Sequence, residues 1–180
     1  STGFDYTLED EDGLTDTGTV TVTVNEPITV STITSDTQTE GTDLVHTVTM
    51  SGASATDETY TFTLVDNTTD SATDYSSAIF SDGVTYDSVT GLITVPAGVT
   101  SFTVTVPTTD DVLDEDDEFY DLVIDSVPAT GTIQDNDTVV VSTVTSDSQL
   151  EGTDLVHTVT MSGASATDET YTFTLVDNTT

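Results

Sequence analysis

Residues 101–124 have the sequence SFTVTVPTTDDVLDEDDEFYDLVI. Large apolar side chains recur at strand-like spacing on both sides of an acidic run. They are Phe102, Val104 and Val106 before it and Phe119, Leu122 and Ile124 after it. Alternation with a period of two residues predicts β-strands. Between these positions, seven of the nine residues 110–118 are Asp or Glu. The stretch therefore predicts two strands joined by an acidic loop.

The acidic loop, residues 110–118, poses an electrostatic problem. Two carboxylates about 4 Å apart repel each other by roughly 4 kcal/mol at an effective dielectric constant near 20. The chain has no Lys or Arg to neutralise them. Such a loop is tolerated when it is splayed in solvent or when a multivalent cation lies among its carboxylates. We expect a cation, and the hypothesis is that this loop is the middle of a calcium site.

The composition argues against several partners. With 34 Asp and Glu residues among 180, the formal net charge is −34. Nucleic acids and anionic membranes would be repelled, so neither is expected as a partner. No apolar stretch has the length of a transmembrane helix, and direct membrane insertion is not expected. The chain has no Cys, so it forms no disulfides, and metal binding is the alternative source of stability for an extracellular protein.

A long repeat organises the chain. Residues 40–69 and 151–180 are identical over thirty positions, and the similarity reaches back to Val30 and Val141, so the period is 111 residues. A period of this length is that of a whole domain in a tandem array. We expect residues 1–27 to be the C-terminal hairpin of a preceding β domain, and residues 28–138 to be one complete repeat. Residues 139–180 are then the N-terminal part of the next repeat.

Period-two alternation covers nearly the whole complete repeat. Apolar residues alternate in short runs separated by Gly, Asp, Asn and Ser, and no helical period is found. Seven or eight such strands predict an all-β fold, an antiparallel, immunoglobulin-like β-sandwich. We expect His46 and His157, which share a strand face with Leu and Val residues, to be partly buried structural histidines.

Further carboxylates fall in the predicted connections between strands. They are Glu40, Asp74, Asp135 and Asp137, besides Asp110, Asp111, Glu115 and Glu118 of the acidic loop. In an antiparallel sandwich several of these connections can share one end. Many oxygen ligands without His or Cys favour Ca²⁺ over zinc or copper, with Mg²⁺ second.

The spacing of these residues resembles the Calx-β family over residues 40–137. The similar features are Glu40-Gly41, Asp74-Tyr75, the strand leading to Asp110-Asp111, the pair Glu115 and Glu118, and the closing run at residues 135–137. The resemblance implies a set of metal ligands: Glu40, Asp74, Asp110, Asp111, Glu115, Glu118, Asp135 and Asp137, with the Leu113 carbonyl as a further oxygen. Two positions depart from the family pattern. Val112 replaces a third Asp and Asn136 interrupts the closing acidic triplet, so a site is weakened or missing there.

The tandem copies and the composition are similar to the extender regions of bacterial RTX-type surface adhesins. The function expected is a calcium-rigidified structural repeat of a secreted, extracellular stalk or surface filament, with neighbouring repeats as partners. Two alternatives stay open: a calcium-dependent adhesive module that binds glycan or another cell, and a self-assembling fibre subunit with other copies as partners. Acidic surface residues can also be merely solvated. We expect no enzymatic activity, because the paired carboxylates lie in strand-end loops and the chain has no Trp to form a sugar platform.

Overall fold

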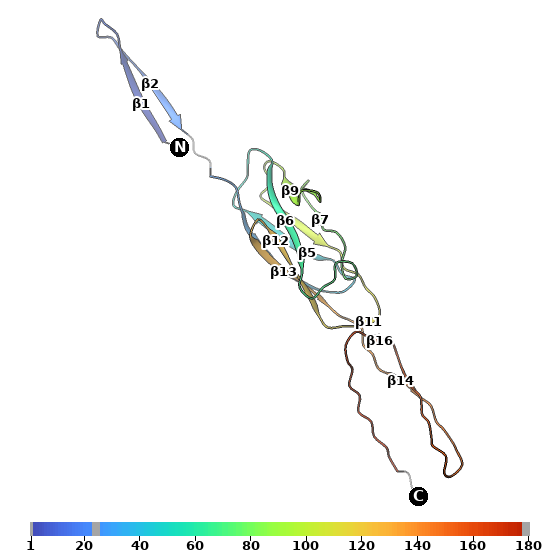
Figure 1. Cartoon of the computed structure of the whole chain (residues 1–180). Helices are drawn as coiled ribbons and strands as arrows, with labels where there is room; N and C mark the ends of the chain where they lie inside the picture. The colour runs from blue at the N-terminus through green and yellow to red at the C-terminus, as the bar shows by residue number, and fades with distance from the viewer. Residues whose placement is uncertain (1, 23–25, 178–180) are drawn as a thin grey trace.

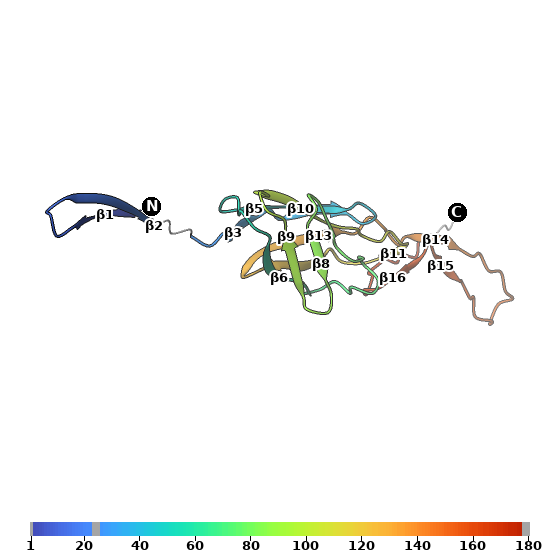
Figure 2. The same cartoon turned by 90° about the horizontal axis from the view of Figure 1, so that it is seen from above.

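The structure, a computed structural model, describes residues 2–22 and 26–177. Every regular element in these ranges is a β-strand, and none of the described residues forms a helix that could cross a membrane. Figure 1 shows a sandwich in the middle of the chain, a hairpin on its N-terminal side and an elongated segment on its C-terminal side. The same arrangement is seen from above in Figure 2.

Two sheets form the sandwich. The four-stranded sheet has the order β3 (Val30–Ile33), β5 (Leu44–Met50), β10 (Ser101–Val106) and β7 (Ile79–Phe80). The six-stranded sheet has the order β4 (Asp36–Thr39), β13 (Val127–Gln134), β12 (Glu118–Ile124), β6 (Glu58–Asp66), β9 (Leu92–Val95) and β8 (Thr85–Asp87). All neighbours in these sheets are antiparallel except β4 and β13, which run parallel. The prediction of an all-β antiparallel sandwich is confirmed.

Alternating residues of both sheets face one core. In β5 the residues Leu44, His46, Val48 and Met50 are buried, whereas the residues between them are exposed or half-buried. The register pairs Phe102 with Val48 and Val106 with Leu44, so β10 adds its apolar face to the same side of the sheet. From the other sheet, Tyr60, Phe62, Tyr120, Leu122 and Ile124 pack into this cluster. Burial of these side chains is the main favourable term that holds the two sheets together.

His46 is a structural residue of this core. Its side chain is fully buried, with Nδ1 2.7 Å from the Thr34 carbonyl oxygen and Nε2 2.9 Å from the Tyr120 hydroxyl. Burial lowers the pKa of His46, because the low-dielectric core disfavours the imidazolium. The expectation of a partly buried histidine was wrong for His157, which is exposed. It keeps the bond to the Thr145 carbonyl, but among the described residues no counterpart of Tyr120 covers it.

The two ends of the chain contain smaller pairings. Strands β1 (Thr2–Glu9) and β2 (Thr15–Val22) pair only with each other within the described residues, around a turn in which Asp10 Oδ1 accepts the Asp12 and Leu14 N–H groups. Beyond the sandwich, β14 (Val141–Val144) pairs with β15 (Val159–Met161). Strand β11 (Leu113–Asp114) of the acidic loop pairs in parallel with β16 (Ala164–Ser165). The sandwich is thus connected to the following segment by main-chain pairing as well as by the chain itself.

Candidate metal centre

Sheet topology gathers the acidic connections at one end of the sandwich. Because β4 and β13 are parallel, with Gln134 paired to Thr39, Glu40 and Asp135 follow neighbouring strand ends. Strand β6 ends at the same level, where Asp66 pairs with Tyr120 near the start of β12. Strand β10 ends beside the start of β5. The connections carrying Glu40, Asp74, Asp135 and the acidic loop therefore share the end of the sandwich that faces residues 139–177.

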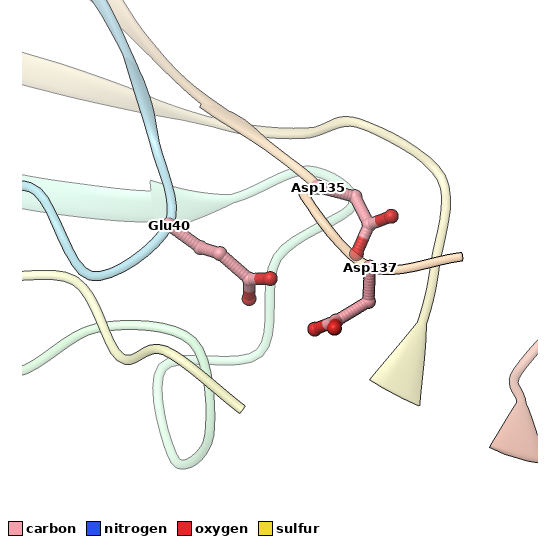
Figure 3. A group of neighbouring side chains, drawn as sticks. All are labelled: Glu40, Asp135 and Asp137. Carbon is pink, nitrogen blue, oxygen red and sulfur yellow. The ribbon is translucent and has the colours of Figure 1, made fainter. Parts of the chain in front are cut away.

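One cluster, called the Glu40 triad, consists of Glu40, Asp135 and Asp137. One carboxylate oxygen of each lies within 4.8 Å of one from each of the others. Figure 3 shows Glu40 reaching across from the segment after β4 toward Asp135 and Asp137, which lie on the segment after β13. The backbone N–H of Glu40 donates to the Gln134 carbonyl (3.0 Å), and this bond fixes the two segments side by side.

The Glu40 triad contains unsatisfied buried oxygens. Glu40 Oε1, Asp135 Oδ1 and Asp137 Oδ2 are inaccessible to solvent and have no hydrogen-bond partner among the described residues. A buried polar atom without a partner costs free energy, and an ionised one costs more. Three such oxygens converging in a chain without Lys or Arg fit a site for a bound cation.

The second cluster, called the Glu118 triad, consists of Asp74, Glu115 and Glu118, whose carboxylate oxygens also lie within 4.8 Å of one another. Local bonds position Asp74. Its Oδ1 accepts the Thr73 hydroxyl (2.7 Å), its Oδ2 accepts the Asp70 N–H, and its carbonyl accepts the Thr109 N–H at 2.8 Å. The connection after β6 is thereby held against the start of the acidic loop.

A cavity of about 20 Å³ lies between the two triads. Its acidic lining includes Glu40 and Asp135 of the first triad, all three residues of the second, and Asp111 and Asp116. A space of this size holds about one water-sized particle. Asp111 is oriented by the Leu113 N–H, which donates to its Oδ1 at 2.7 Å. The two triads and Asp111 therefore form one continuous carboxylate-lined centre.

The pKa values of the three glutamates are all displaced upward. Burial, together with the neighbouring Asp74 and Glu115 carboxylates, raises the pKa of Glu118 to about 8. Burial also raises the pKa of Glu40, with the Asp135 and Asp111 charges adding to the effect. The pKa of Glu115 is raised by burial and then by Asp111 and Asp74. Without a cation, the centre favours protons on its glutamates, because desolvated like charges destabilise one another.

Two predicted ligands, Asp110 and Leu113, lie outside both the triads and the lining of the cavity. The Asp110 side chain packs against Gly41 and accepts the Asn136 amide at 3.3 Å. Leu113 is half-buried in β11, paired with Ala164. Val112, which replaces an acidic residue of the family pattern, is 80% exposed. Gly41 has a φ of +74°, and a Cβ there would lie 2.7 Å from the Asp110 Cβ, so the turn before β5 requires glycine.

Two residues have roles that the sequence pattern does not indicate. Asp117 Oδ1 accepts the Asp135 N–H at 3.3 Å, and this contact supports the Glu40 triad. Asp114 does not line the cavity, and its Oδ2 accepts the Val139 N–H at 3.1 Å. Both contacts join segments that are 18 or 25 residues apart in sequence, so no local motif marks them.

No protein-family model and no curated protein matches the chain. Among solved structures, it is similar to one titled "Crystal structure of CBD12 from CALX1.2", with 19% sequence identity and a TM-score of 0.45. The likeness covers 61% of this chain and 46% of that chain, so the match spans less than half the length of the solved structure. This chain is an all-β sandwich with a carboxylate-lined centre at one end.

Proposed function

We propose that this chain is a structural, calcium-stiffened repeat unit of a secreted, extracellular array, such as the stalk of a bacterial surface adhesin. The observation that carries the proposal is the set of three buried, unpartnered oxygens of the Glu40 triad in a chain without Lys or Arg. A divalent cation supplies the missing partner for all three. A second cation would relieve the repulsion among the carboxylates of the Glu118 triad.

Calcium is the ion that the donors suit best. The centre offers only oxygen ligands, and neither His nor Cys lines its cavity. Ca²⁺ takes six to eight oxygens in flexible geometry, whereas Mg²⁺ keeps several waters and uses fewer carboxylates. The resemblance of the acidic spacing to the Calx-β family supports the same choice. Glu40, Asp135 and Asp137 would hold one ion, and Asp74, Glu115 and Glu118 another, with Asp111 between them.

A structural role follows from what the acidic loop contacts. Asp111, Glu115 and Glu118 face the centre, whereas Leu113 and Asp114 bind the segment that follows the sandwich. A cation that orders the loop therefore also orders the junction to the next unit. Such coupling of binding and folding suits an extracellular protein, because calcium is scarce in the cytosol where the chain is made.

We infer no catalytic role. Of the two histidines, His46 is buried and both of its ring nitrogens lie at hydrogen-bond distance from partners in the core. The acidic groups surround a cavity of about 20 Å³, which suits a single ion or water molecule.

Calorimetric titration and thermal unfolding with calcium or with chelator test the proposal. Calcium at about a hundredfold excess over a dissociation constant stabilises the fold by roughly 2.7 kcal/mol per site. Glu40→Gln is expected to remove one ion from the stoichiometry. Glu151→Gln is the matched control, because Glu151 occupies the same place in the repeated sequence and is exposed. An unchanged melting temperature on adding calcium, or equal effects of the two variants, would refute the assignment.

A further inference from the structure

The sandwich contacts the second repeat through one short edge. Leu113 and Asp114 pair in parallel with Ala164 and Ser165. The Asp114 carbonyl accepts the Ala166 N–H at 2.9 Å and the Ser165 hydroxyl at 3.2 Å. Val112 and Leu113 line an open cavity with Gly163 and Ala164. Residues 164–166 thus form a receiving edge for the tip of the acidic loop, residues 112–114.

The complete repeat carries the same edge 111 residues earlier. Ala53, Ser54 and Ala55 are the counterparts of Ala164, Ser165 and Ala166, within the identical thirty-residue stretch. We call residues 53–55 together with Ile28 the acceptor edge.

The local bonds that shape the edge recur in both copies. The Tyr60 hydroxyl donates to the Ile28 carbonyl at 2.8 Å, as the Tyr171 hydroxyl donates to the Val139 carbonyl at 2.9 Å. The Thr56 N–H donates to Ser54 Oγ at 3.2 Å, and the equivalent bond at Ser165 has the same length. The acceptor edge therefore shares these local bonds with the edge that holds the loop in the second repeat, and its Ser54 carbonyl additionally accepts the Gly98 N–H at 2.9 Å.

Among the described residues, no strand pairs with the acceptor edge. A groove of about 600 Å³ lies along it, lined by Ile28, Ala53 and Ala55 among others. Within residues 2–22 and 26–177, no residue accepts a hydrogen bond from the Ala55 N–H, the counterpart of the N–H that binds Asp114. Strands β1 and β2 pair only with each other among the described strands, and Figure 1 shows their hairpin extending away from the sandwich.

We propose that the acceptor edge binds residues 112–114 of a second copy of this chain, giving head-to-tail association. Leu113 of one copy pairs with Ala53 of the other, and the Asp114 carbonyl accepts the Ala55 N–H. The exposed Val112 side chain adds apolar contact in the groove beside Ile28. The two surfaces are different parts of the molecule, so the contact is heterologous and can propagate into a filament. This inference goes beyond calcium binding and rests on the paired edges alone.

Two effects oppose the contact between separate chains. In each chain the loop is already bound by its own residues 164–166, and the tether gives that contact a high effective concentration. Glu58 lines the groove and Asp111 and Asp114 belong to the loop, so the two surfaces also repel at low ionic strength. Releasing the loop with Ala166→Pro, which removes the N–H that binds Asp114, and raising the salt concentration are therefore expected to strengthen association.

Directed disulfide exchange tests the pairing, because the chain has no cysteine of its own. Neighbouring strands lie about 4.8 Å apart, which is within the Cα separation of a disulfide. One chain carries Leu113→Cys, activated as an aromatic mixed disulfide, with Ala166→Pro. The other carries Ala53→Cys as a free thiol. Attack of that thiolate joins the chains and releases the aromatic thiol.

Val89→Cys is the control thiol, because Val89 is 92% exposed and far from the edge in sequence. After correction for reactivity toward a small disulfide, exchange at position 53 is expected to be severalfold faster than at position 89. Ala55→Pro in the thiol chain should abolish the excess. Equal rates at positions 53 and 89, or an excess that survives Ala55→Pro, would overturn the proposal. The exchange rate of each pair of chains is measured in high salt, once with calcium and once with chelator. Faster exchange at position 53 in both conditions supports docking whether or not the chain binds calcium.

Discussion

The carboxylate of Asp114 accepts a hydrogen bond from the Val139 N–H at 3.1 Å, across the junction between the sandwich and the second repeat. Asp114 lies between Asp111 and Glu115, which both line the carboxylate cavity. Within one loop, Asp111 and Glu115 therefore line the candidate cation centre, whereas Asp114 contacts the next repeat. The state of the centre and the stiffness of the junction are linked through the short stretch of backbone from Asp111 to Glu115.

Removing this link is expected to loosen the junction without unfolding the sandwich. Asp114→Ala deletes the acceptor of the Val139 N–H but keeps all members of both triads. A hydrogen bond to a charged group contributes about 1.5–3 kcal/mol when shielded, and less at this half-exposed position. Small-angle scattering with calcium should show a broader distribution of lengths, at an unchanged melting temperature of the sandwich. Asp168→Ala, in an exposed part of the second repeat, is the control and should leave the distribution unchanged.

The ion-free protein is expected to lose stability as the pH rises from about 5 to above 8. The pKa of Glu118 is about 8 in the fold and near 4.5 in the unfolded chain, so the folded state holds an extra proton between these values. Stability from this group is fully present below pH 4.5 and is lost as the pH rises through 8. The raised pKa values of Glu40 and Glu115 act in the same direction. Urea unfolding at pH 6 and pH 9 in chelator measures the effect, and a rise in stability toward pH 9 would contradict it.

Glu118→Gln should separate the stability of the fold from its response to calcium. The uncharged amide removes the repulsion with Asp74 and Glu115, so the ion-free variant is expected to be more stable than the natural sequence at pH 9. It also removes a ligand, so the gain in melting temperature on adding calcium should shrink. Thermal unfolding of both proteins with and without calcium measures the stability of the ion-free variant and its gain in melting temperature. A variant that responds to calcium as strongly as the natural sequence would exclude Glu118 as a ligand.

Gly41→Ala tests the turn that presents Glu40. Alanine at a φ of +74° costs roughly 1 kcal/mol from backbone strain. Its Cβ would also lie 2.7 Å from the Asp110 Cβ, so the acidic loop must shift. We expect a weaker calcium affinity and a loss of stability above 1 kcal/mol. Gly152→Ala has the same sequence context, a φ of +89° and no atom within 4 Å of its Cβ, so it isolates the strain.

Tyr120→Phe tests the core independently of calcium. The substitution leaves the buried His46 Nε2 without the Tyr120 hydroxyl, at an expected cost of about 1–3 kcal/mol. Urea unfolding measures this, with Tyr86→Phe at a partly exposed position as the control. Calcium stoichiometry should be unchanged. An equal loss in both variants would mean that the Tyr120–His46 bond contributes little.

The period-two pattern predicts most of the fold because burial on one face imposes alternation on each strand. It also places Glu40, Asp74 and Asp135 correctly in connections between strands. The division into two triads could not be predicted, because it depends on the parallel pairing of β4 with β13 across more than ninety residues of chain. The junction role of Asp114 depends on a contact with the next repeat, which no spacing within the loop indicates. His157 is exposed although the same stretch buries His46, because residues 139–177 contain no counterpart of strand β12 and its Tyr120.

The parallel pairing of β4 with β13 has a mechanical consequence. Strand β4 lies near the beginning of the complete repeat and β13 at its end, and both run toward the carboxylate centre. Tension along the chain pulls β4 backward through β3 and pulls β13 forward. The two strands are therefore sheared past each other, and the pairs from Gly131 with Asp36 to Gln134 with Thr39 are loaded together. A patch that breaks all at once resists a higher force than one that is peeled open pair by pair, and the Glu40 triad lies directly at its end.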